Sequence, residues 1–279
     1  MRFSAIIGDS TCISTFSTYV HAVYRLGRKQ CVMKIEQKGI GFINSTGLQD
    51  GGDWFSIFIP KIESGLFRHY DFAGLNERIP DQNYIFIEFS VDDLVQMLSA
   101  TQLCYLKIKL TKNEKQDPIL RIEIRCPESE ILTHKLPVEV IMSRNWTDYA
   151  KPSLGLRKMS IYLPQAKVLN RVLQSYKNMK AKVVVFNASS SGDLRVETTV
   201  ENGEIDVLFN DLATDISESD SQETQSSVKL MVKNISLLFQ SFYFSSSRVR
   251  MNIITDRMAE FGINAEEYQL TYVVGSVTE

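Results

Sequence analysis

MRFSAIIGDSTCISTFSTYVHAV, residues 1–23, contains the pattern on which the rest of the chain is built. Phe3 to Ile7 is typical of a strand, and Asp9 or Ser10 can cap a helix directly after it. The apolar residues of this helix fall on one face: Ile13, Phe16, Val20 and Val23. Three further strands are expected at Cys31 to Glu36, Gly39 to Asn44 and Asp53 to Ile59. The stretch predicts a unit of one strand, one helix and three strands.

The same order of elements returns three times. After the strand Tyr84 to Phe89, Ser90 can cap a second helix, with Asp93 at the position that completes a capping box. Its strands are expected at Cys104 to Thr111, Ile119 to Arg125 and Ile131 to Ile141. The third copy comprises strand Lys158 to Leu163, helix Pro164 to Asn178, and strands Lys182 to Asn187, Arg195 to Val200 and Glu204 to Phe209. The fourth comprises strand Val228 to Val232, helix Lys233 to Tyr243, and strands Arg248 to Thr255, Ala259 to Ile263 and Tyr268 to Val274.

The repeat predicts an α+β fold of two matching domains. Residues 1–141 and 158–279 would each hold two helices packed on antiparallel sheets, and residues 142–157, with Pro152 and Gly155, would connect them. The acidic, Ser-rich segment Asp211 to Ser227 has no apolar pattern, and we expect it to be a mobile loop.

Composition limits the classes of function. The chain has 279 residues, 44% hydrophobic and 23% charged, as in an ordinary folded protein. A net charge of -2 does not by itself predict a nucleic-acid partner, so the position of the cations decides that question. There is no apolar run of the ~18 residues that a membrane helix needs, and we expect an intracellular protein without a membrane partner.

Four stretches together resemble one family. They are the opening MRFSAIIGDSTCISTF, LKIKLTKN at 106–113, ILTHKLPVEVI at 131–141 and MSIYLP at 159–164. The chain resembles the HUS subunit of the nine-one-one DNA-damage checkpoint clamp, whose fold is the PCNA-like DNA sliding clamp. The resemblance implies a nuclear, non-catalytic subunit without cofactors. Its partners would be two different clamp-fold subunits that complete a heterotrimeric ring, double-stranded DNA, a clamp loader, and repair and checkpoint proteins.

A clamp that slides on DNA needs long cations directed at phosphates and no groups that recognise bases. Polar stripes opposite the apolar faces of the first and third helices offer candidates. These are His21, Arg25, Arg28 and Lys29, and Lys167, Arg171, Lys177 and Lys180. The alternative is that both stripes are ordinary solvated helix faces. The other two helices depart from the pattern, because Asp92 and Asp93 open one and Lys233 is the only charge in the other.

Ring closure requires open strand edges. By their position in the repeat, Ile131 to Ile141 and Glu204 to Phe209 would each meet a neighbouring subunit, with Val138, Val140, Ile205 and Val207 as interface residues. Pro137 also favours an edge strand. These residues can equally serve the subunit's own sheets.

The resemblance also implies a pocket for partner proteins beneath the connecting segment. Its residues would be Ile40, Phe42, Met142, Trp146, Tyr272 and Val274. Trp146 can instead be a packing residue.

Enzyme motifs are absent from the sequence, among them the P-loop, G-x-S-x-G, H-E-x-x-H and G-x-G-x-x-G patterns. We expect no catalytic residue and no metal site. Two alternatives remain: a homotrimeric PCNA-like processivity clamp, and a metal-dependent nuclease that uses Asp92, Asp93 and Glu88. Adjacent acids at a helix start are more simply explained by capping.

Overall fold

The structure, a computed structural model, describes residues 1–26, 29–76, 78–79, 82–99, 103–126, 130–201, 203–215, 224–242, 248–254 and 258–277. The chain forms two compact units. The first contains residues 1–44, 56–150 and 266–269, and the second contains residues 45–55, 151–265 and 270–279. The segment 45–55 therefore groups with the second unit although it lies early in the sequence.

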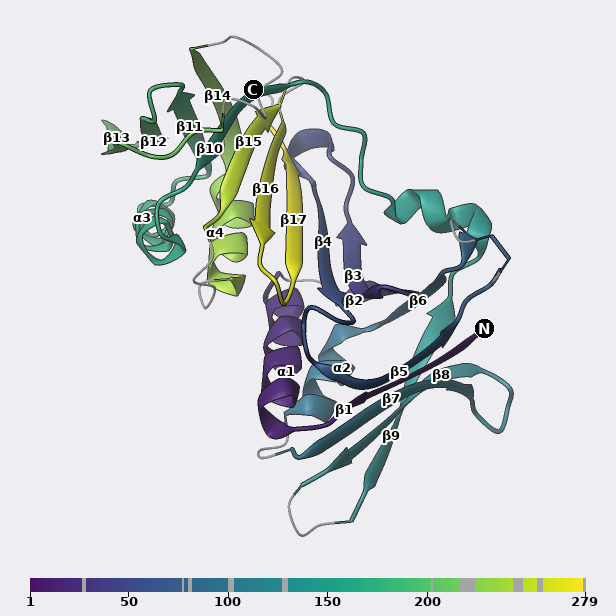
Figure 1. Cartoon of the computed structure of the whole chain (residues 1–279). Helices are drawn as coiled ribbons and strands as arrows, with labels where there is room; N and C mark the ends of the chain where they lie inside the picture. The colour runs from purple at the N-terminus through teal and green to yellow at the C-terminus, as the bar shows by residue number, and fades with distance from the viewer. Residues whose placement is uncertain are drawn as a thin grey trace. The chain divides into compact units, whose positions relative to one another are not determined.

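The first unit is a continuous antiparallel arrangement of strands beside two helices (Figure 1). Its strands are β1 (Arg2–Ile7), β2 (Gln30–Glu36), β3 (Gly39–Ser45), β4 (Asp53–Pro60), β5 (Phe67–Ala73), β6 (Ile85–Ser90), β7 (Tyr105–Lys112), β8 (Pro118–Arg125) and β9 (Leu132–Val140). From β3 they lie in the order β3-β2-β6-β9-β8-β7-β1-β5. Helix α1 (Ser10–Arg25) packs against α2 (Val91–Leu98). A short 3-10 turn, Gln49–Gly51, precedes β4.

The caps predicted for both helices are confirmed. An Asp9 Oδ1 oxygen accepts a hydrogen bond of 2.8 Å from the Cys12 backbone N–H, which begins α1. Ser90 does the same for α2, accepting from the Asp93 backbone N–H at 3.3 Å. The first turn of each helix leaves such donors without helical partners, so the caps decide where the helices start.

The second unit contains two sheets and two helices. Its elements are β10 (Arg157–Tyr162), α3 (Ala166–Asn178), β11 (Val183–Ser189), β12 (Leu194–Val200), β13 (Gly203–Phe209), β14 (Gln225–Met231), α4 (Val232–Ser241), β15 (Arg250–Ile254), β16 (Met258–Asn264) and β17 (Gln269–Gly275). One sheet has the order β10-β15-β16-β17, followed by the beginning of β4, and the other has the order β13-β12-β11-β14.

Helix α3 packs against α4 and is hydrogen-bonded to the four-stranded sheet. The buried Tyr176 hydroxyl donates a hydrogen bond of 2.6 Å to the Val196 carbonyl, and burial raises the pKa of Tyr176 to about 12. The predicted helix end at Tyr243 and the middle of the predicted mobile loop, residues 216–223, lie outside the described residues. The last three residues of that predicted loop, 225–227, already belong to β14.

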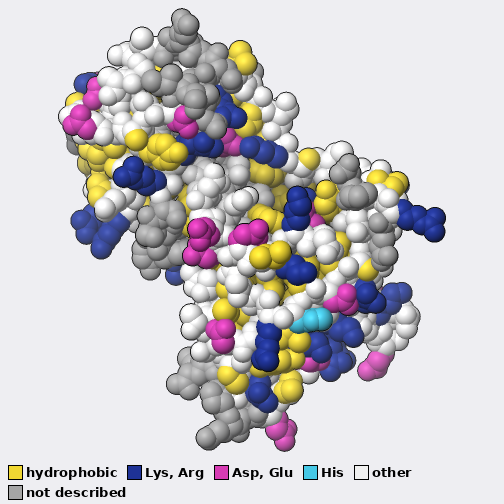
Figure 2. Space-filling view, in the orientation of Figure 1, with side chains coloured by type: hydrophobic (Ala, Val, Ile, Leu, Met, Phe, Trp, Pro, Cys, Tyr) yellow, Lys and Arg dark blue, Asp and Glu magenta, His cyan; other side chains and the backbone are white. Residues whose placement is uncertain are grey.

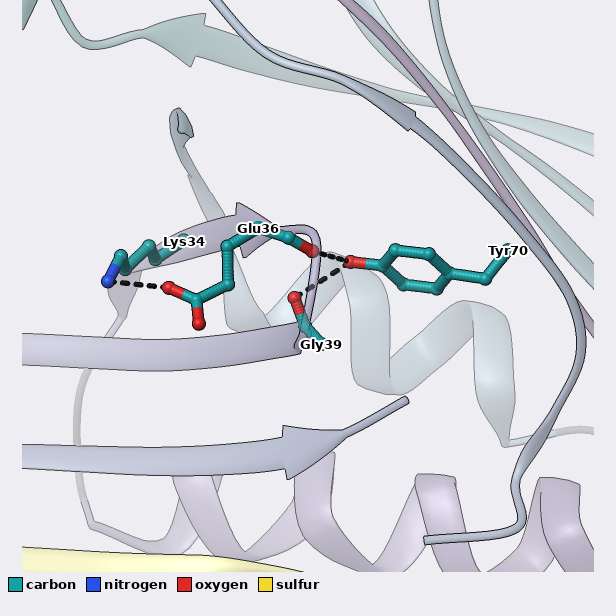
Figure 3. A network of polar contacts seen from close by, with 4 residues as sticks. All are labelled: Lys34, Glu36, Gly39 and Tyr70. Carbon is teal, nitrogen blue, oxygen red and sulfur yellow. Dashed lines mark hydrogen bonds and ion pairs between the residues drawn. The ribbon is translucent and has the colours of Figure 1, made fainter. Parts of the chain in front are cut away.

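Strand β5 was not predicted, and it carries a key packing contact of the first unit. Its Tyr70 hydroxyl lies 2.6 Å from the Glu36 carbonyl and 2.7 Å from the Gly39 carbonyl, so it closes the β2–β3 hairpin (Figure 3). Lys34 Nζ lies 2.7 Å from Glu36 Oε2 on the same hairpin. The Tyr70 ring packs edge-on against Phe3, and burial raises its pKa.

We expect Tyr70→Phe to lower the free energy of unfolding by about 1 to 2 kcal/mol, because two carbonyls lose their shared donor while the ring packing is kept. Chemical denaturation measures the change. Tyr24→Phe, at an exposed position of α1, is the matched control and should be neutral. Equal stability of the Tyr70 variant and the wild type would show that this hydroxyl is not important for the hairpin.

Candidate nucleic-acid and subunit interfaces

Two candidate cations, one at the end of α1 and one just after it, lie in solvent. Arg25 and Lys29 are exposed, whereas His21 is half-buried and its Nδ1 lies 2.8 Å from the Ser17 carbonyl. That local hydrogen bond orients the His21 ring along the helix. Arg28 lies outside the described residues.

Helix α3 presents a comparable exposed face. Lys167, Arg171 and Lys177 are all exposed, and Lys180 follows the helix with a positive φ of 61°. The buried face of the same helix is apolar, with Leu169 and Leu173 fully enclosed. The two helices in equivalent repeat positions thus both carry cations opposite their packed face.

The remaining two helices contribute little positive charge. Asp92 and Asp93 lie in the first turn of α2, which stabilises the helix dipole but would repel phosphate. In α4, Lys233 is exposed and Asn234 is used structurally, donating a hydrogen bond of 2.6 Å to the Gly51 carbonyl. The cationic character of the helices is therefore uneven, as the sequence predicts.

Strand β9 pairs with two different strands of its own unit. Leu132–Pro137 pairs with β8, and Val138–Val140 pairs with β6. The Ile141 N–H bonds the Phe86 carbonyl of β6. Because backbone groups alternate along a strand, the N–H groups of Thr133 and Lys135 point to the same side, away from β8. Among the described residues no strand covers that edge at Leu132–Pro137.

The predicted interface residues Val138 and Val140 lie in the half of β9 that pairs with β6, and their contact with a neighbouring subunit stays a prediction. Val138 is buried opposite Phe89, and Val140 lies opposite Ile87, so this half of β9 already has β6 as its neighbour within the chain's own sheet. The open part of β9 is its first half, where Leu132 is 56% exposed. Proline lacks an N–H, so Pro137 ends this open edge at little cost.

The second candidate edge is β13, which lies at the end of the four-stranded sheet. Ile205 and Val207 are half-buried and pair with Thr198 and Val196 of β12. The alternating residues Glu204, Asp206 and Leu208 are exposed. The edge therefore carries two acids and one exposed leucine, and no strand covers its outer side among the described residues.

The two edges occupy equivalent positions in the repeat. In the second unit, β17 neighbours the beginning of β4 in the strand order. Strands β4, β9, β13 and β17 are each the fourth strand of one of the four repeats. The pairing that β17 finds within the chain is thus the one that β9 and β13 lack.

The predicted partner pocket is not supported by burial. Ile40 and Phe42 are fully buried in the first unit, and Tyr272 and Val274 are fully buried in the second. Their side chains serve the cores: Phe42 packs on Phe16 and Phe89, and the Tyr272 hydroxyl donates a hydrogen bond of 2.7 Å to Asp53. These four side chains therefore contribute to the cores, and the partner pocket stays a prediction.

Met142 and Trp146 occupy the connecting segment, which forms a 3-10 helix at Ser143–Tyr149. Met142 is 62% exposed. Trp146 stacks on Phe86 with ring centroids 5.1 Å apart, and its Nε1–H donates a hydrogen bond of 3.0 Å to the Ile141 carbonyl. In the first unit, Trp146 therefore acts as a packing residue.

The second unit holds a partly buried ionic contact that the sequence did not reveal. Lys151 Nζ lies 2.5 Å from Glu260 Oε1, and Asn252 donates a hydrogen bond of 2.8 Å to Glu260 Oε2. Burial raises the pKa of Glu260, but the hydrogen bonds from Lys151 and Asn252 and the charge of Arg157 outweigh it, so the pKa lies below its usual value. A glutamate at a buried strand position was the only available signal.

The described part of the chain contains no group of three or more His, Cys, Asp or Glu side chains that could hold a metal ion. Within the same residues, none of the helices is both long and apolar enough to span a bilayer. The acids proposed for a nuclease, Asp92 and Asp93, occupy the first turn of α2 after the Ser90 cap.

Comparisons with known proteins agree with this architecture. A family model described as Hus1-like protein matches residues 1–278. The human checkpoint protein HUS1 is 26% identical, and the match covers 100% of both chains. The Drosophila melanogaster checkpoint protein Hus1-like is 24% identical over 82% of each chain, and Schizosaccharomyces pombe checkpoint protein hus1 is 23% identical over 76% of this chain and 70% of its own.

Solved structures confirm the predicted clamp fold. PCNA from Thermococcus kodakaraensis superimposes with a TM-score of 0.70 at 15% identity, covering 98% of this chain and 99% of its own. The Entamoeba histolytica proliferating cellular nuclear antigen gives 0.73 at 11% identity, with both chains covered completely.

The Glu260 cluster predicts a pH-dependent effect. We expect Lys151→Gln to destabilise the chain by about 1 kcal/mol at neutral pH, since Lys151 is half exposed and its charge partly screened. A lowered pKa contributes stability above the usual value of 4.5 and loses it as the pH falls through the lowered pKa. The difference in Tm between variant and wild type should therefore shrink on acidification. Lys182→Gln, also exposed in the second unit, is the control, and a pH-independent difference would contradict the assignment.

Proposed function

This chain belongs to the Hus1-like family, and on that premise we propose that it is a non-catalytic subunit of a heterotrimeric ring clamp in the nucleus. The ring is loaded onto double-stranded DNA at damage sites by a clamp loader. Once there, it serves as a scaffold for checkpoint signalling and repair enzymes. The names of its relatives support the checkpoint role, and the family match over residues 1–278 extends that support to the whole chain.

The observation that supports assembly best is the pair of open strand edges. Edge backbone groups readily recruit another strand, and β9 and β13 occupy the repeat positions at which β17 and β4 are neighbours within the chain. A second chain of the same fold can supply each missing strand. Such contacts are directional, from β9 of one subunit to the β13 equivalent of the next, and therefore suit a closed ring.

DNA contact is assigned to the exposed cations of α1 and α3. Arg25, Lys29, Lys167 and Arg171 are long, exposed side chains of the kind that hold phosphates without recognising bases. Since α2 and α4 add few cations, the other two subunits supply much of the positive field in this proposal.

One observation favours a second candidate, a homotrimeric clamp. The open edge of β9 carries Lys135, and the open edge of β13 carries Glu204 and Asp206, so two copies of this chain have complementary charges at the contact. The mass of the protein purified alone separates the candidates, because a self-assembling clamp is a stable trimer without partners.

The edge assignment predicts the effect of one proline. We expect Thr133→Pro to reduce recovery of a 1:1:1 particle at least about tenfold on co-expression with two companion clamp subunits, because it removes a donor from the open edge of β9 and leaves the donors directed at β8. Size-exclusion chromatography with mass measurement gives the stoichiometry. Thr133→Val keeps the N–H and should assemble normally. Normal assembly of the proline variant would exclude this edge.

The cation assignment predicts a loss of DNA retention. Arg25→Glu combined with Arg171→Glu should speed escape of the assembled ring from circular duplex DNA. The slope of log affinity against log salt should fall by about 2, one for each lost phosphate contact. Lys115→Glu with Lys182→Glu gives the same change in net charge at exposed positions outside α1 and α3. Equal retention by the two double variants would refute the assignment.

A further inference from the structure

Three cations stand directly opposite one another on neighbouring strands of the first unit. Lys109 of β7 pairs with Arg121 of β8, and Arg121 pairs with Lys135 of β9. All three side chains are exposed and lie on one face of the sheet. Figure 2 shows Lys and Arg side chains gathered over these strands. We call this set the cross-strand cation row.

Nearby acids do not neutralise the row. Glu123 lies 3.0 Å from the Arg121 Nε and 3.6 Å from the Lys107 Nζ, so its charge is shared between two cations. Asp71, further along the sheet, is held by Arg2 at 3.0 Å. Among the described residues, Lys109 and Lys135 have no carboxylate partner. Like charges directly opposite each other in a sheet are destabilising, so the row weakens the isolated fold.

The row lies on the face of the sheet away from the helices. Residues between the cations alternate inward: Ile108, Leu120, Ile122 and Leu136 are buried, on the side where α1 meets β7 and α2 meets β9. Under the proposed function, the helices contact DNA, so encircled DNA does not reach the row. Its ligand must be another anion.

We propose that the cross-strand cation row binds an acidic segment of a partner protein, in which Asp or Glu alternates with other residues. Adjacent strands lie about 4.8 Å apart, so the row spans about 10 Å, and alternate side chains of an extended peptide lie about 7 Å apart. The long lysine side chains can cover the difference between the spacing of neighbouring strands and the spacing of alternate peptide side chains. Glu123 beside the row disfavours a continuous phosphate backbone but leaves room for separate carboxylates. This inference rests on the proposed function in one respect: that function places the encircled DNA on the helix side of the sheet, away from the cross-strand cation row.

The test combines binding with stability. A fluorescein-labelled peptide of alternating Glu and Ser should bind the full-length chain at low salt, and Lys109→Gln with Lys135→Gln should weaken its binding about tenfold. The same double variant should raise the Tm by about 1 to 3 °C, because both substitutions relieve repulsion with Arg121. Weaker peptide binding together with a higher Tm indicates that these lysines bind a ligand and do not stabilise the fold. A variant that folds poorly would instead have a lower Tm.

The matched control is Lys38→Gln with Lys115→Gln, two exposed turn lysines of the same unit, which should change neither quantity. Equal weakening by the control would reduce the effect to net charge and overturn the proposal. Equal binding of a Gln-Ser peptide would also overturn it, as would tighter binding of a short DNA duplex that depends on the same lysines. Because the assay uses the isolated chain, failure of the wild-type chain to bind the Glu-Ser peptide while a 1:1:1 ring still forms would refute this inference and leave the proposed function standing.

Discussion

Backbone pairing is the constraint on which this structure depends. Every strand must find partners for its N–H and C=O groups, and most of the chain's edges are closed internally. Thr214 bridges to Ile161 on β10, and the Val277 N–H bonds the Lys229 carbonyl beside β14. Strand β5 is an edge carrying the charged side chains of Arg68 and Asp71, which discourage unselective pairing. The first half of β9 and the outer side of β13 remain open, whereas β4 and β17, which hold the equivalent positions in the other two repeats, are neighbours within the chain.

The elements that the sequence predicted well are those with strong local signals. Asp9 and Ser90 identified two helix starts because capping is local chemistry, and the apolar period of each helix named its buried face. Strand β5 escaped because Arg68, His69 and Asp71 break its apolar alternation, and its place is fixed by pairing with β1, far away in sequence. Non-local pairing leaves little trace in a single sequence.

The site residues show a similar division. Exposure of Lys167 and Arg171 followed from the helical period, whereas the burial of Ile40, Phe42, Tyr272 and Val274 shows that apolar strand residues assigned by analogy to a pocket belong to cores. Val138 and Val140 lie in the half of β9 that pairs with β6, and the sequence did not show which half of the strand is open. Periodicity gives the face of a strand, while the partner on each edge requires the fold.

Partner choice at the open edges is decided more by packing than by charge. Exposed ion pairs such as one between Lys135 and an acid contribute at most about 1 kcal/mol, so complementary charges cannot alone impose self-assembly. Leu132 is 56% exposed and Leu208 is 48% exposed, and enclosing the exposed half of such a side chain contributes roughly 0.8 to 1.5 kcal/mol, half of the value for full burial. A neighbour whose edge strand offers apolar surface at these two positions therefore outcompetes one that offers only opposite charge. The charges then act mainly on the rate of encounter, and heteromeric assembly is compatible with the electrostatic self-complementarity of this chain.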